Sequence, residues 1–283
     1  MTPLRCAVIG TGHLGSIHAR LLKSIDQVDL VGVVDPNPES RHRVAQQCET
    51  QALEHHRQLR GKLDAAVIAT PTQFHYSVAA DLLQDDVHLL IEKPVTSTVA
   101  EANGLISMAE KRGRVLQVGH VERFNPAWKA AAPQLQQPKY VEALRAGPYT
   151  FRSTDVSVVL DLMIHDLDIV AQLAGSEVDH IDAVGIPVLS STEDIANARI
   201  RFANGCILNI TASRVSLEKM RKIRLFQADA YLSIDLATNK FVVIRRGGPG
   251  DGGSPEILAE NLEFDAAYAL LAEDRAFVES VRS

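Results

Sequence analysis

The residues best suited to acid–base chemistry in this chain lie between Val158 and Val170, in the run VVLDLMIHDLDIV. Asp161 and His165 are four positions apart, so on a helix they lie one above the other on the same face. A carboxylate that orients an imidazole forms a general-base pair. Asp168 extends this face, and the apolar residues between would pack the helix against a sheet. The same stripe is also typical of a solvent-facing helix surface, so the rest of the chain has to decide between the two interpretations.

Composition narrows the classes of protein to which the chain can belong. It has 283 residues, 46% of them hydrophobic, which is enough to bury the cores of two domains. A formal net charge of −6 disfavours a nucleic-acid partner, because such partners select basic surfaces. Three widely spaced cysteines without metal-binding spacing indicate reduced thiols, no metal site and a cytoplasmic location. No apolar run approaches the length of about 20 residues that crosses a bilayer, and the start of the sequence lacks a signal-peptide pattern, so we expect no membrane association.

The start of the chain carries a dinucleotide-binding pattern in the order strand, turn, helix. An apolar strand over Leu4–Ile9 runs into GTGHLG, and Ser16–Leu22 has helix-forming character. The first glycine permits a tight turn, the second lets the backbone approach a pyrophosphate, and the third allows close helix–strand packing. The alternative is a nucleotide-free unit with turn glycines. The glycine turn is expected to bind the cofactor through Gly10, Thr11, Gly12, His13, Leu14 and Gly15.

A second apolar strand, Leu30–Val34, supports the nucleotide interpretation. It ends in Asp35, about 20 residues after the third glycine, where an acid can accept hydrogen bonds from the adenosine ribose. An acidic residue there disfavours a 2′-phosphate, and no arginine follows directly, so the sequence favours NAD over NADP.

Alternation of short strands and helices continues to about residue 120 and predicts a parallel sheet covered by helices on both faces. Ligands bind beyond the carboxyl ends of such strands, which gives weight to Thr70, Pro71 and Glu92-Lys93-Pro94. A lysine at a strand end can point its ammonium toward a nicotinamide site and hold a hydroxyl or a developing alkoxide. The Lys93–Pro94 bond is of the type that can be cis. The alternative for Lys93 is a solvated lysine at a strand end.

From about residue 121 the pattern changes to strands in succession, which predicts a largely antiparallel open sheet packed against the helix of residues 158–173. Asn204-Gly205 is a strong hairpin signal between two of these strands. The glycine-rich segment 246–255 is typical of a mobile loop or a broken hairpin, and Phe264–Val281 predicts a closing amphipathic helix. We therefore expect an α/β fold with two domains, a Rossmann domain over residues 1–120 and an α+β domain for substrate binding and oligomerisation over residues 121–283. The predicted strands are Lys139–Arg145, Asp182–Leu189, Asp194–Phe202, Cys206–Ser213, Lys222–Phe226, Tyr231–Asp235 and Lys240–Arg245.

With these motifs in place, the whole chain resembles the glucose–fructose oxidoreductase/inositol dehydrogenase (Gfo/Idh/MocA) family. The match is carried by GTGHLGSIHA, ATPTQFH, EKP and DLMIHDLD, in that order and spacing. The resemblance implies an NAD-dependent oxidoreductase in which Lys93, Asp161 and His165 face the nicotinamide. His165 would accept or donate the proton, Lys93 would orient the hydroxyl, and Asp161 would orient either of them. It also adds His75, Glu92 and Lys93 to the residues expected near the cofactor.

A narrower resemblance, to the UDP-N-acetylglucosamine 3-dehydrogenase branch of that family, is carried by GHVERFNP and RAGPYTFRSTDVSVVLDLMIHD. It implies hydride removal from carbon 3 of a UDP-amino sugar, giving a ketone that a separate aminotransferase can aminate. Arg145 and Arg152 would contact phosphate because a guanidinium matches phosphate bidentately, whereas the alternative for each is a surface charge or a structural ion pair. The residues expected on the substrate side are Glu122, Arg123, Asn125, Arg145, Arg152 and Asp168.

Two other functions remain open at this point. A dehydrogenase of a free sugar, inositol or another cyclic alcohol would not need converging arginines. A non-catalytic NAD-binding regulator with the same fold would not need Lys93, Asp161 and His165.

The family resemblance further implies a homodimer or homotetramer formed through a sheet face. The sequence ends at Arg282-Ser283, earlier than is usual in the family, and segment 246–255 is unusually rich in glycine. Both departures could alter that contact.

Overall fold

The computed structural model describes residues 2–150, 156–249, 255–265 and 269–283. The chain divides into two compact units, Met1–Val121 with Tyr268–Ser283, and Glu122–Ala267. Along the chain, the first unit changes to the second between Val121 and Glu122. The end of the chain, however, belongs to the first unit and not to the second. None of the described helices is long and apolar enough to cross a membrane.

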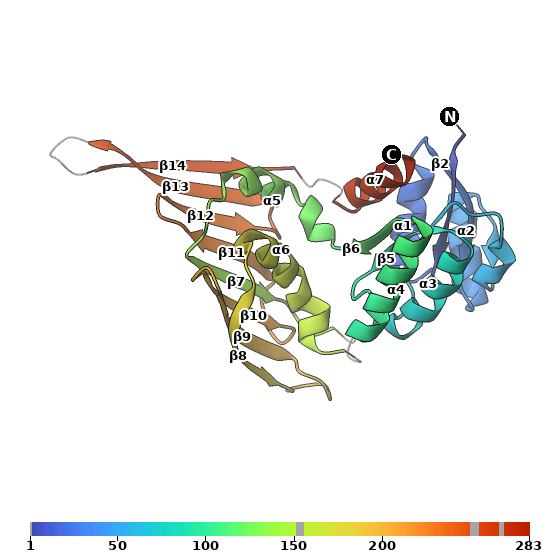
Figure 1. Ribbon diagram of the computed structural model, residues 1–283, viewed down its shortest axis with the longest axis horizontal. Helices are drawn as coiled ribbons and strands as arrows, with labels where there is room; N and C mark the ends of the chain where they lie inside the picture. The colour runs from blue at the N-terminus through green and yellow to red at the C-terminus, as the bar shows by residue number, and fades with distance from the viewer. Residues whose placement is uncertain (1, 151–155, 250–254, 266–268) are drawn as a thin grey trace. The chain divides into compact units, whose positions relative to one another are not determined.

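The first unit is built on a six-stranded parallel sheet in the order β3-β2-β1-β4-β5-β6 (Figure 1). Its central strand β4 is buried along its whole length, as expected for a strand with helices on both faces. One face packs against α1, α2 and α7, and the other against α3 and α4. This is the predicted Rossmann architecture. Its strands are β1 (Leu4–Ile9), β2 (Val28–Val34), β3 (Ala52–Leu53), β4 (Ala65–Ile68), β5 (His88–Glu92) and β6 (Leu116–Gly119).

Helix ends in this unit follow local sequence signals. Thr98 and Glu101 form a reciprocal capping box at the start of α4, and Gly113 ends that helix in the left-handed conformation. Asn37 caps α2 through its side chain, whereas the N-cap of α1 is Gly12, which offers no side-chain cap. The α-helices of this unit are α1 (His13–Lys23), α2 (Pro38–Cys48), α3 (His75–Gln84), α4 (Val99–Arg112) and α7 (Ala269–Arg282).

The closing helix α7 begins at Ala269, five positions after the predicted start at Phe264. Phe264 instead packs against the core of the second unit, and its amide donates to the carbonyl of Asn239. Phe277 and Val278 on α7 are fully buried with Leu22 of α1 in one cluster of the first unit. The amphipathic pattern was therefore real, but its apolar face covers the Rossmann sheet.

The second unit is an eight-stranded mixed sheet in the order β14-β13-β12-β11-β7-β10-β9-β8. Only the β7–β10 pair is parallel among the described pairings, so the sheet is mostly antiparallel, as predicted. The hairpin at Asn204-Gly205 joins β9 to β10, and Gly205 has φ of +84°. The strands are β7 (Tyr140–Ala146), β8 (Val178–Ile186), β9 (Ile195–Phe202), β10 (Ile207–Ser213), β11 (Met220–Phe226), β12 (Ala230–Asp235), β13 (Lys240–Pro249) and β14 (Pro255–Glu263).

Strand β14 was not predicted, and the glycine-rich segment 246–255 explains why. Glycine disfavours strands, yet β13 continues through this segment to Pro249 and β14 begins at Pro255. The rest of the predicted loop, residues 250–254, lies outside the described residues.

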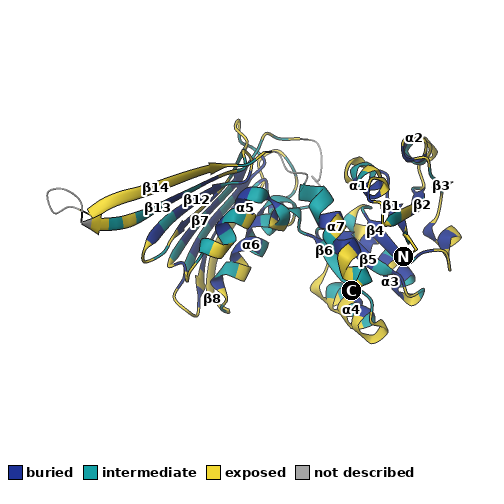
Figure 2. Cartoon of the chain, turned by 90° about the horizontal axis from the view of Figure 1, so that it is seen from above, coloured by how far each residue is buried: buried dark blue, intermediate teal, exposed yellow. Residues whose placement is uncertain are grey.

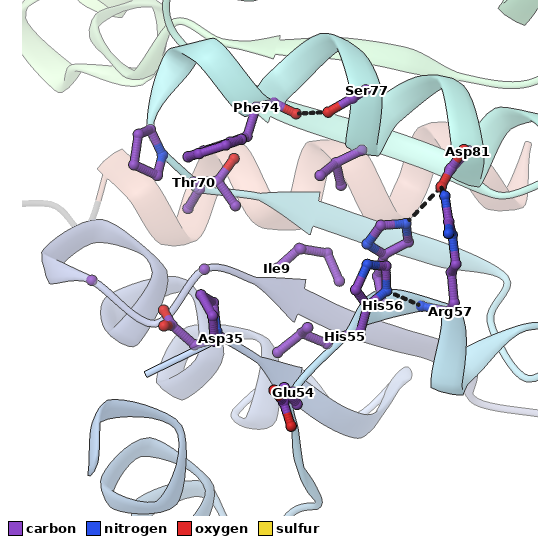
Figure 3. A pocket seen from close by; sticks show the side chains of 17 residues that line it. Ile9, Asp35, Glu54, His55, His56, Arg57, Thr70, Phe74, Ser77 and Asp81 are labelled. Atoms are coloured by element: carbon purple, nitrogen blue, oxygen red, sulfur yellow. Dashed lines mark hydrogen bonds and ion pairs between the residues drawn. The ribbon is translucent and has the colours of Figure 1, made fainter. Parts of the chain in front are cut away.

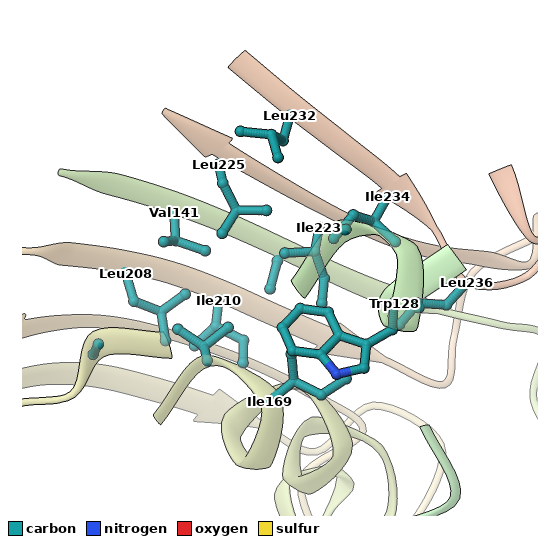
Figure 4. Close-up of a cluster of buried hydrophobic side chains, with 14 of the residues drawn as sticks. Trp128, Val141, Ile169, Leu208, Ile210, Ile223, Leu225, Leu232, Ile234 and Leu236 are labelled. Carbon is teal, nitrogen blue, oxygen red and sulfur yellow. The ribbon is translucent and has the colours of Figure 1, made fainter. Parts of the chain in front are cut away.

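Helices α5 (Pro126–Ala131) and α6 (Ile164–Ala174) cover one face of this sheet. Trp128 of α5 lies next to Ile223, Ile234 and Leu236, and Ile169 of α6 belongs to the same buried cluster (Figure 4). The edge strands β8 and β14 are exposed along their length (Figure 2). This cluster fixes α6, the helix that carries the predicted acid–base residues, to the sheet.

Candidate active site

The glycine turn after β1 brings helix α1 unusually close to the strand. Gly10 has φ of +97°, and a Cβ at this position would lie 2.5 Å from the carbonyl oxygen of Ala69. A Cβ on Gly15 would lie 1.9 Å from the carbonyl oxygen of Gly10. The space around Gly12 is open, with nothing within 4 Å of its Cβ position. The first and third glycines are therefore required by packing, and the second leaves room for a ligand to approach the backbone at the start of α1.

Asp35 follows β2 and holds its carboxylate beside the glycine turn. One oxygen accepts from the amide of Thr11 at 2.8 Å, and the other accepts from the amide of Asn37 at 2.8 Å. Each carboxylate oxygen can accept more than one hydrogen bond, so both retain capacity for ribose hydroxyls. The guanidinium of Arg41 donates to the carbonyls of Asp35 and Pro36, at 3.2 and 2.9 Å. The Arg41 guanidinium is thus hydrogen-bonded to backbone carbonyls. This agrees with a ribose site whose charged group is the carboxylate of Asp35.

A cavity of about 720 Å³ opens between the glycine turn, Asp35 and the residues after β4 (Figure 3). It is large enough for part of a dinucleotide. Ile9, Val34, Ala69 and Val78 give it an apolar lining, and Thr70 and Pro71 also line it. The fit of the glycine turn, the acid and the cavity supports a bound adenine dinucleotide.

Part of the cavity wall comes from residues that the sequence did not indicate. Asp81 on α3 accepts from Arg57 at 2.7 Å and lies 3.1 Å from the ring of His56 (Figure 3). Burial lowers the pKa of His56, although the Asp81 carboxylate opposes that shift. The strand before these residues, β3, has only two residues, which is too short for a periodic signal. The spacing of Ser77 and Asp81 on one face of α3 was the available signal.

Lys93 follows β5 and its bond to Pro94 is cis. Its amide donates to the carboxylate of Glu92 at 3.2 Å. Glu92 is 7% exposed and its other carboxylate oxygen lies 3.0 Å from Nε2 of His18. His75 is 1% exposed, with its two ring nitrogens on the carbonyl oxygens of Thr70 and Pro94. Glu92 and His75 are therefore built into the frame around Lys93, while His13 and Leu14 are exposed on α1.

In the second unit, Asp161 lies in a π-helical segment, Val159–Met163, that leads directly into α6. Asp161 and His165 are both partly buried. A π-helical turn is wider than an α-helical turn and often occurs at functional sites. The regular four-residue spacing assumed from the sequence is therefore modified here, because the two residues stand on either side of a change in helix type.

In the second unit, Arg145 is buried and forms ion pairs with two carboxylates. Its side chain is 3% exposed and donates to Asp166 at 2.8 and 2.9 Å and to Glu122 at 2.9 Å. Arg221 adds a second guanidinium to Glu122 at 3.2 Å. Burial by itself would lower the pKa of Arg145, but the two carboxylates outweigh it and raise that pKa. The structure thus favours the ion-pair alternative for Arg145 and Glu122. Asp166, which the sequence reasoning overlooked, is their partner on α6.

The remaining substrate-side candidates are placed as follows. Arg123 forms a two-point ion pair with Asp168 on α6, with its Nε 2.7 Å from one carboxylate oxygen. Asn125 is buried, caps α5 and donates to the carbonyl of Leu236 at 3.1 Å. Arg152 lies outside the described residues.

Comparisons with known proteins agree with this architecture. A model of an oxidoreductase family with an NAD-binding Rossmann fold matches residues 4–120, and a model of the Gfo/Idh/MocA C-terminal domain matches residues 131–232. The fold and the glycine–acid site thus define an oxidoreductase with an NAD-binding Rossmann domain. The chain belongs to the Gfo/Idh/MocA family.

Individual relatives span most of the chain. UDP-N-acetylglucosamine 3-dehydrogenase of Acidithiobacillus ferrooxidans is 38% identical over 99% of this chain and 90% of its own. Its solved structure superposes with a TM-score of 0.93, covering 100% of this chain and 90% of that one. An NAD⁺-dependent scyllo-inositol 2-dehydrogenase of Bacillus subtilis is 29% identical over 75% of this chain and 68% of its own. Levoglucosan dehydrogenase in complex with NADH, at 16% identity and a TM-score of 0.85 over 99% of this chain and 90% of that one, shares the fold.

Proposed function

We propose that the protein is an NAD-dependent dehydrogenase that oxidises the 3-hydroxyl of UDP-N-acetylglucosamine, or of a related UDP-sugar, to a ketone. The observation that carries this proposal is the 38% identity to a UDP-N-acetylglucosamine 3-dehydrogenase across 99% of the chain, which includes both structural units. A relative that matched only the Rossmann domain would support the cofactor and not the substrate.

NAD is the proposed cofactor because the residues present suit it. Gly10 and Gly15 allow the close turn, Gly12 leaves the start of α1 open to a pyrophosphate, and Asp35 offers a carboxylate to the ribose. A 2′-phosphate at that position would meet the negative charge of Asp35, which disfavours NADP. When bound, the nicotinamide ring supplies the acceptor for the hydride that leaves the substrate carbon.

The proton chemistry is assigned to three side chains. His165 accepts the proton of the substrate hydroxyl, which leaves the electron pair on oxygen to form the carbonyl as the hydride departs. Lys93 donates a hydrogen bond to the same oxygen and stabilises the negative charge that develops there. Asp161 orients the acid–base groups. This assignment rests on the family resemblance of EKP and DLMIHDLD, with the π-helical turn at Asp161 as structural support.

Contacts to the diphosphate are proposed for Arg123 and Arg152. Arg123 is chosen over Arg145 because its side chain is 45% exposed, whereas that of Arg145 is 3% exposed. Arg145 is no longer proposed for this role, because removing it would take the paired guanidinium from the buried carboxylate of Asp166 and leave Glu122 with Arg221.

The test is NADH formation with a panel of UDP-sugars, free sugars and inositols. We expect turnover with UDP-N-acetylglucosamine and a product that has lost two hydrogens. Turnover with free sugars or inositols and none with any UDP-sugar would contradict the substrate assignment.

One observation favours a second candidate, a dehydrogenase of a free cyclic alcohol. The chain is also similar to an inositol dehydrogenase, and the structural pairing of Arg145 leaves fewer guanidiniums for a diphosphate than the sequence suggested. The same panel distinguishes the two candidates.

We also propose that the protein forms a homodimer or homotetramer. Exposed apolar residues on the edge strand β8, among them Val178, Ile181 and Val184, are each more than half exposed, which is unusual for a monomer surface. Light scattering coupled to size exclusion should give a mass of two or four chains, and a mass of one chain would contradict the proposal.

A further inference from the structure

Lys93 lies between Glu92 and Pro94 in the sequence. Each of these two neighbours contacts a buried histidine that belongs to another element of the first unit. On one side, the carboxylate of Glu92 lies 3.0 Å from Nε2 of His18 on α1. On the other, the carbonyl oxygen of Pro94 lies 2.9 Å from Nδ1 of His75 at the start of α3. The side chain of His18 is 0% exposed and His75 is 1% exposed. Neither ring can therefore reach substrate, but both are attached to the segment that carries Lys93.

His18 forms a bridge between three elements. Its Nδ1 lies 2.8 Å from a carboxylate oxygen of Asp274 on α7, while its Nε2 contacts Glu92 at the end of β5. A carboxylate only accepts, so both contacts are hydrogen bonds when both ring nitrogens carry hydrogen. Burial by itself would lower the pKa of His18, but the two carboxylates outweigh it and raise that pKa to about 10. Through these two contacts the ring joins α7 to the strand that precedes Lys93.

The residues around His18 include the types that bind metal ions, but their distances fit hydrogen bonds better than metal coordination. His18, Glu92 and Glu273 place ligand atoms within 4.8 Å of one another. A metal would need a ring nitrogen free of hydrogen, whereas both nitrogens of His18 lie at hydrogen-bond distance from carboxylates. We therefore interpret the cluster as a charged hydrogen-bond bridge.

The neighbouring strand β6 leaves space for the contact between Glu92 and His18. Gly119 of β6 pairs with Glu92, and a Cβ at Gly119 would lie 3.1 to 3.2 Å from the Glu92 side chain and Cα. Such contacts are tighter than ordinary van der Waals packing. Glycine at this position leaves room for the Glu92 carboxylate to turn inward toward His18.

His75 connects the two loops that follow the neighbouring strands β4 and β5. Its Nε2 lies 2.8 Å from the carbonyl oxygen of Thr70, and its Nδ1 lies 2.9 Å from that of Pro94. Carbonyl oxygens only accept, so the ring makes both bonds at once when it carries hydrogen on each nitrogen. The bridge fixes the distance between the Thr70-Pro71 edge of the cofactor cavity and the segment of Lys93.

We propose that His18 and His75 are positioning residues that fix the backbone on either side of Lys93 and thereby aim its ammonium. This inference rests on the proposed catalytic role of Lys93. Displacing a catalytic group by about 1 Å can cost about a hundredfold in rate, so such a frame has a measurable effect on turnover.

The first experiment compares His75→Phe and His18→Gln with His88→Phe. His88 begins the same strand β5, where its ring accepts from the amide of Val115 at 2.9 Å, and it is the matched control at the end far from Lys93 along the strand. We expect His75→Phe and His18→Gln to lower kcat about tenfold to a hundredfold while the Kd for NAD changes less than about threefold. His88→Phe should leave kcat nearly unchanged. If His18→Gln does not fold, Asp274→Asn tests the same bridge with a conservative change.

A second readout follows Lys93 without turnover or cofactor. Lysines are ¹³C-methylated, and the Lys93 signal is assigned by its loss in Lys93→Arg. The proposal predicts a shifted or broadened Lys93 signal in the His75 and His18 variants and an unchanged one in His88→Phe. An unchanged Lys93 signal in both variants would overturn it. A stoichiometric metal ion in the purified protein, removed together with activity in the His18 variant, would replace the bridge with a metal site.

A double-mutant comparison separates failure of this inference from failure of the proposed function. If the wild type reduces NAD with no UDP-sugar, the proposed function is wrong, and if Lys93→Ala turns over at the normal rate, the catalytic role of Lys93 is wrong. If Lys93→Ala is impaired and His75→Phe lowers its residual rate by the same factor as in the wild type, the positioning role is wrong. Loss of the His75 effect in the Lys93→Ala background supports it.

Discussion

The two units hold their candidate catalytic residues with different chemistry. In the first unit, two buried histidines contact the residues next to Lys93. One lies between the carboxylates of Glu92 and Asp274, and the other contacts backbone carbonyls. In the second, arginines hold the helix of His165, because Arg145 pairs with Asp166 of α6. Both arrangements place charged groups in the interior, where an ion that loses its partner is costly.

This difference shows what residue type alone leaves open. The sequence analysis allowed either a phosphate contact or a structural ion pair for Arg145, and in the structure Arg145 of β7 pairs with Asp166 of α6. The family resemblance placed His75 near the cofactor, and in the structure its ring nitrogens contact the backbone carbonyls of Thr70 and Pro94.

The largest effect is expected from removing His165, the proposed acid–base group. His165→Ala should lower kcat about a hundredfold to ten-thousandfold, because proton transfer by a positioned side chain contributes a factor of this size. NAD affinity should change little, since the residues that suit the cofactor lie in the first unit. Steady-state kinetics with calorimetric titration of NAD measure both quantities. A near-normal kcat would remove His165 from the mechanism.

Removing the buried ion pairs of Arg145 should lower the free energy of unfolding. Arg145→Met leaves Asp166 and Glu122 buried with one cation fewer, which should cost about 3–5 kcal/mol in the free energy of unfolding. Arg201→Met is the control, because its pair with Asp179 is more than half exposed on the arginine side and should contribute little. Urea unfolding measures both. A stable Arg145→Met protein with a selectively raised KM for the UDP-sugar would return Arg145 to the substrate site.

Substitution of Asp35 should weaken the binding of the cofactor. Asp35→Ala removes a charged acceptor from the proposed ribose site and should weaken NAD binding about tenfold to a hundredfold, since charged hydrogen bonds contribute about 1.5–3 kcal/mol. The preference for NAD over NADP should fall at the same time. Titration of both cofactors checks this, and an unchanged ratio of the two affinities would show that Asp35 does not select between them.

The histidine frame should also give stability a specific pH dependence. The folded pKa of His18 is raised to about 10, above its ordinary value, so protonation of His18 stabilises the fold most at low pH. That contribution is fully present below the unfolded pKa of about 6.5 and is lost as the pH rises to about 10. Besides His18, the cluster contains Glu92, Glu273 and Asp274. Unfolding free energies of the wild type should fall more steeply over this window than those of His18→Gln, and equal slopes would contradict the charged bridge.

Much of the first unit could be predicted from the sequence because its signals are local. The glycine turn, the acid after β2 and the lysine after β5 each follow from strand ends in a parallel sheet. The hairpin at Asn204-Gly205 is local in the same way.

The rest depends on contacts between distant positions. His18 and Asp274 are 256 positions apart, and no spacing rule connects them. The assignment of α7 to the first unit depends on which core its apolar face covers, and strand β14 follows a segment whose glycines are typical of a loop. The partner of Arg145 is a carboxylate on a helix whose polar positions alone could not show which ones face inward.

The most direct test of the central claim is a single reaction with purified protein, NAD and UDP-N-acetylglucosamine as the only alcohol. The account predicts one NADH for each UDP-sugar that loses two hydrogens, with the new ketone located at carbon 3 by ¹³C NMR. Absence of NADH with UDP-N-acetylglucosamine and other UDP-sugars, under conditions where an inositol or a free sugar reduces NAD, would contradict it.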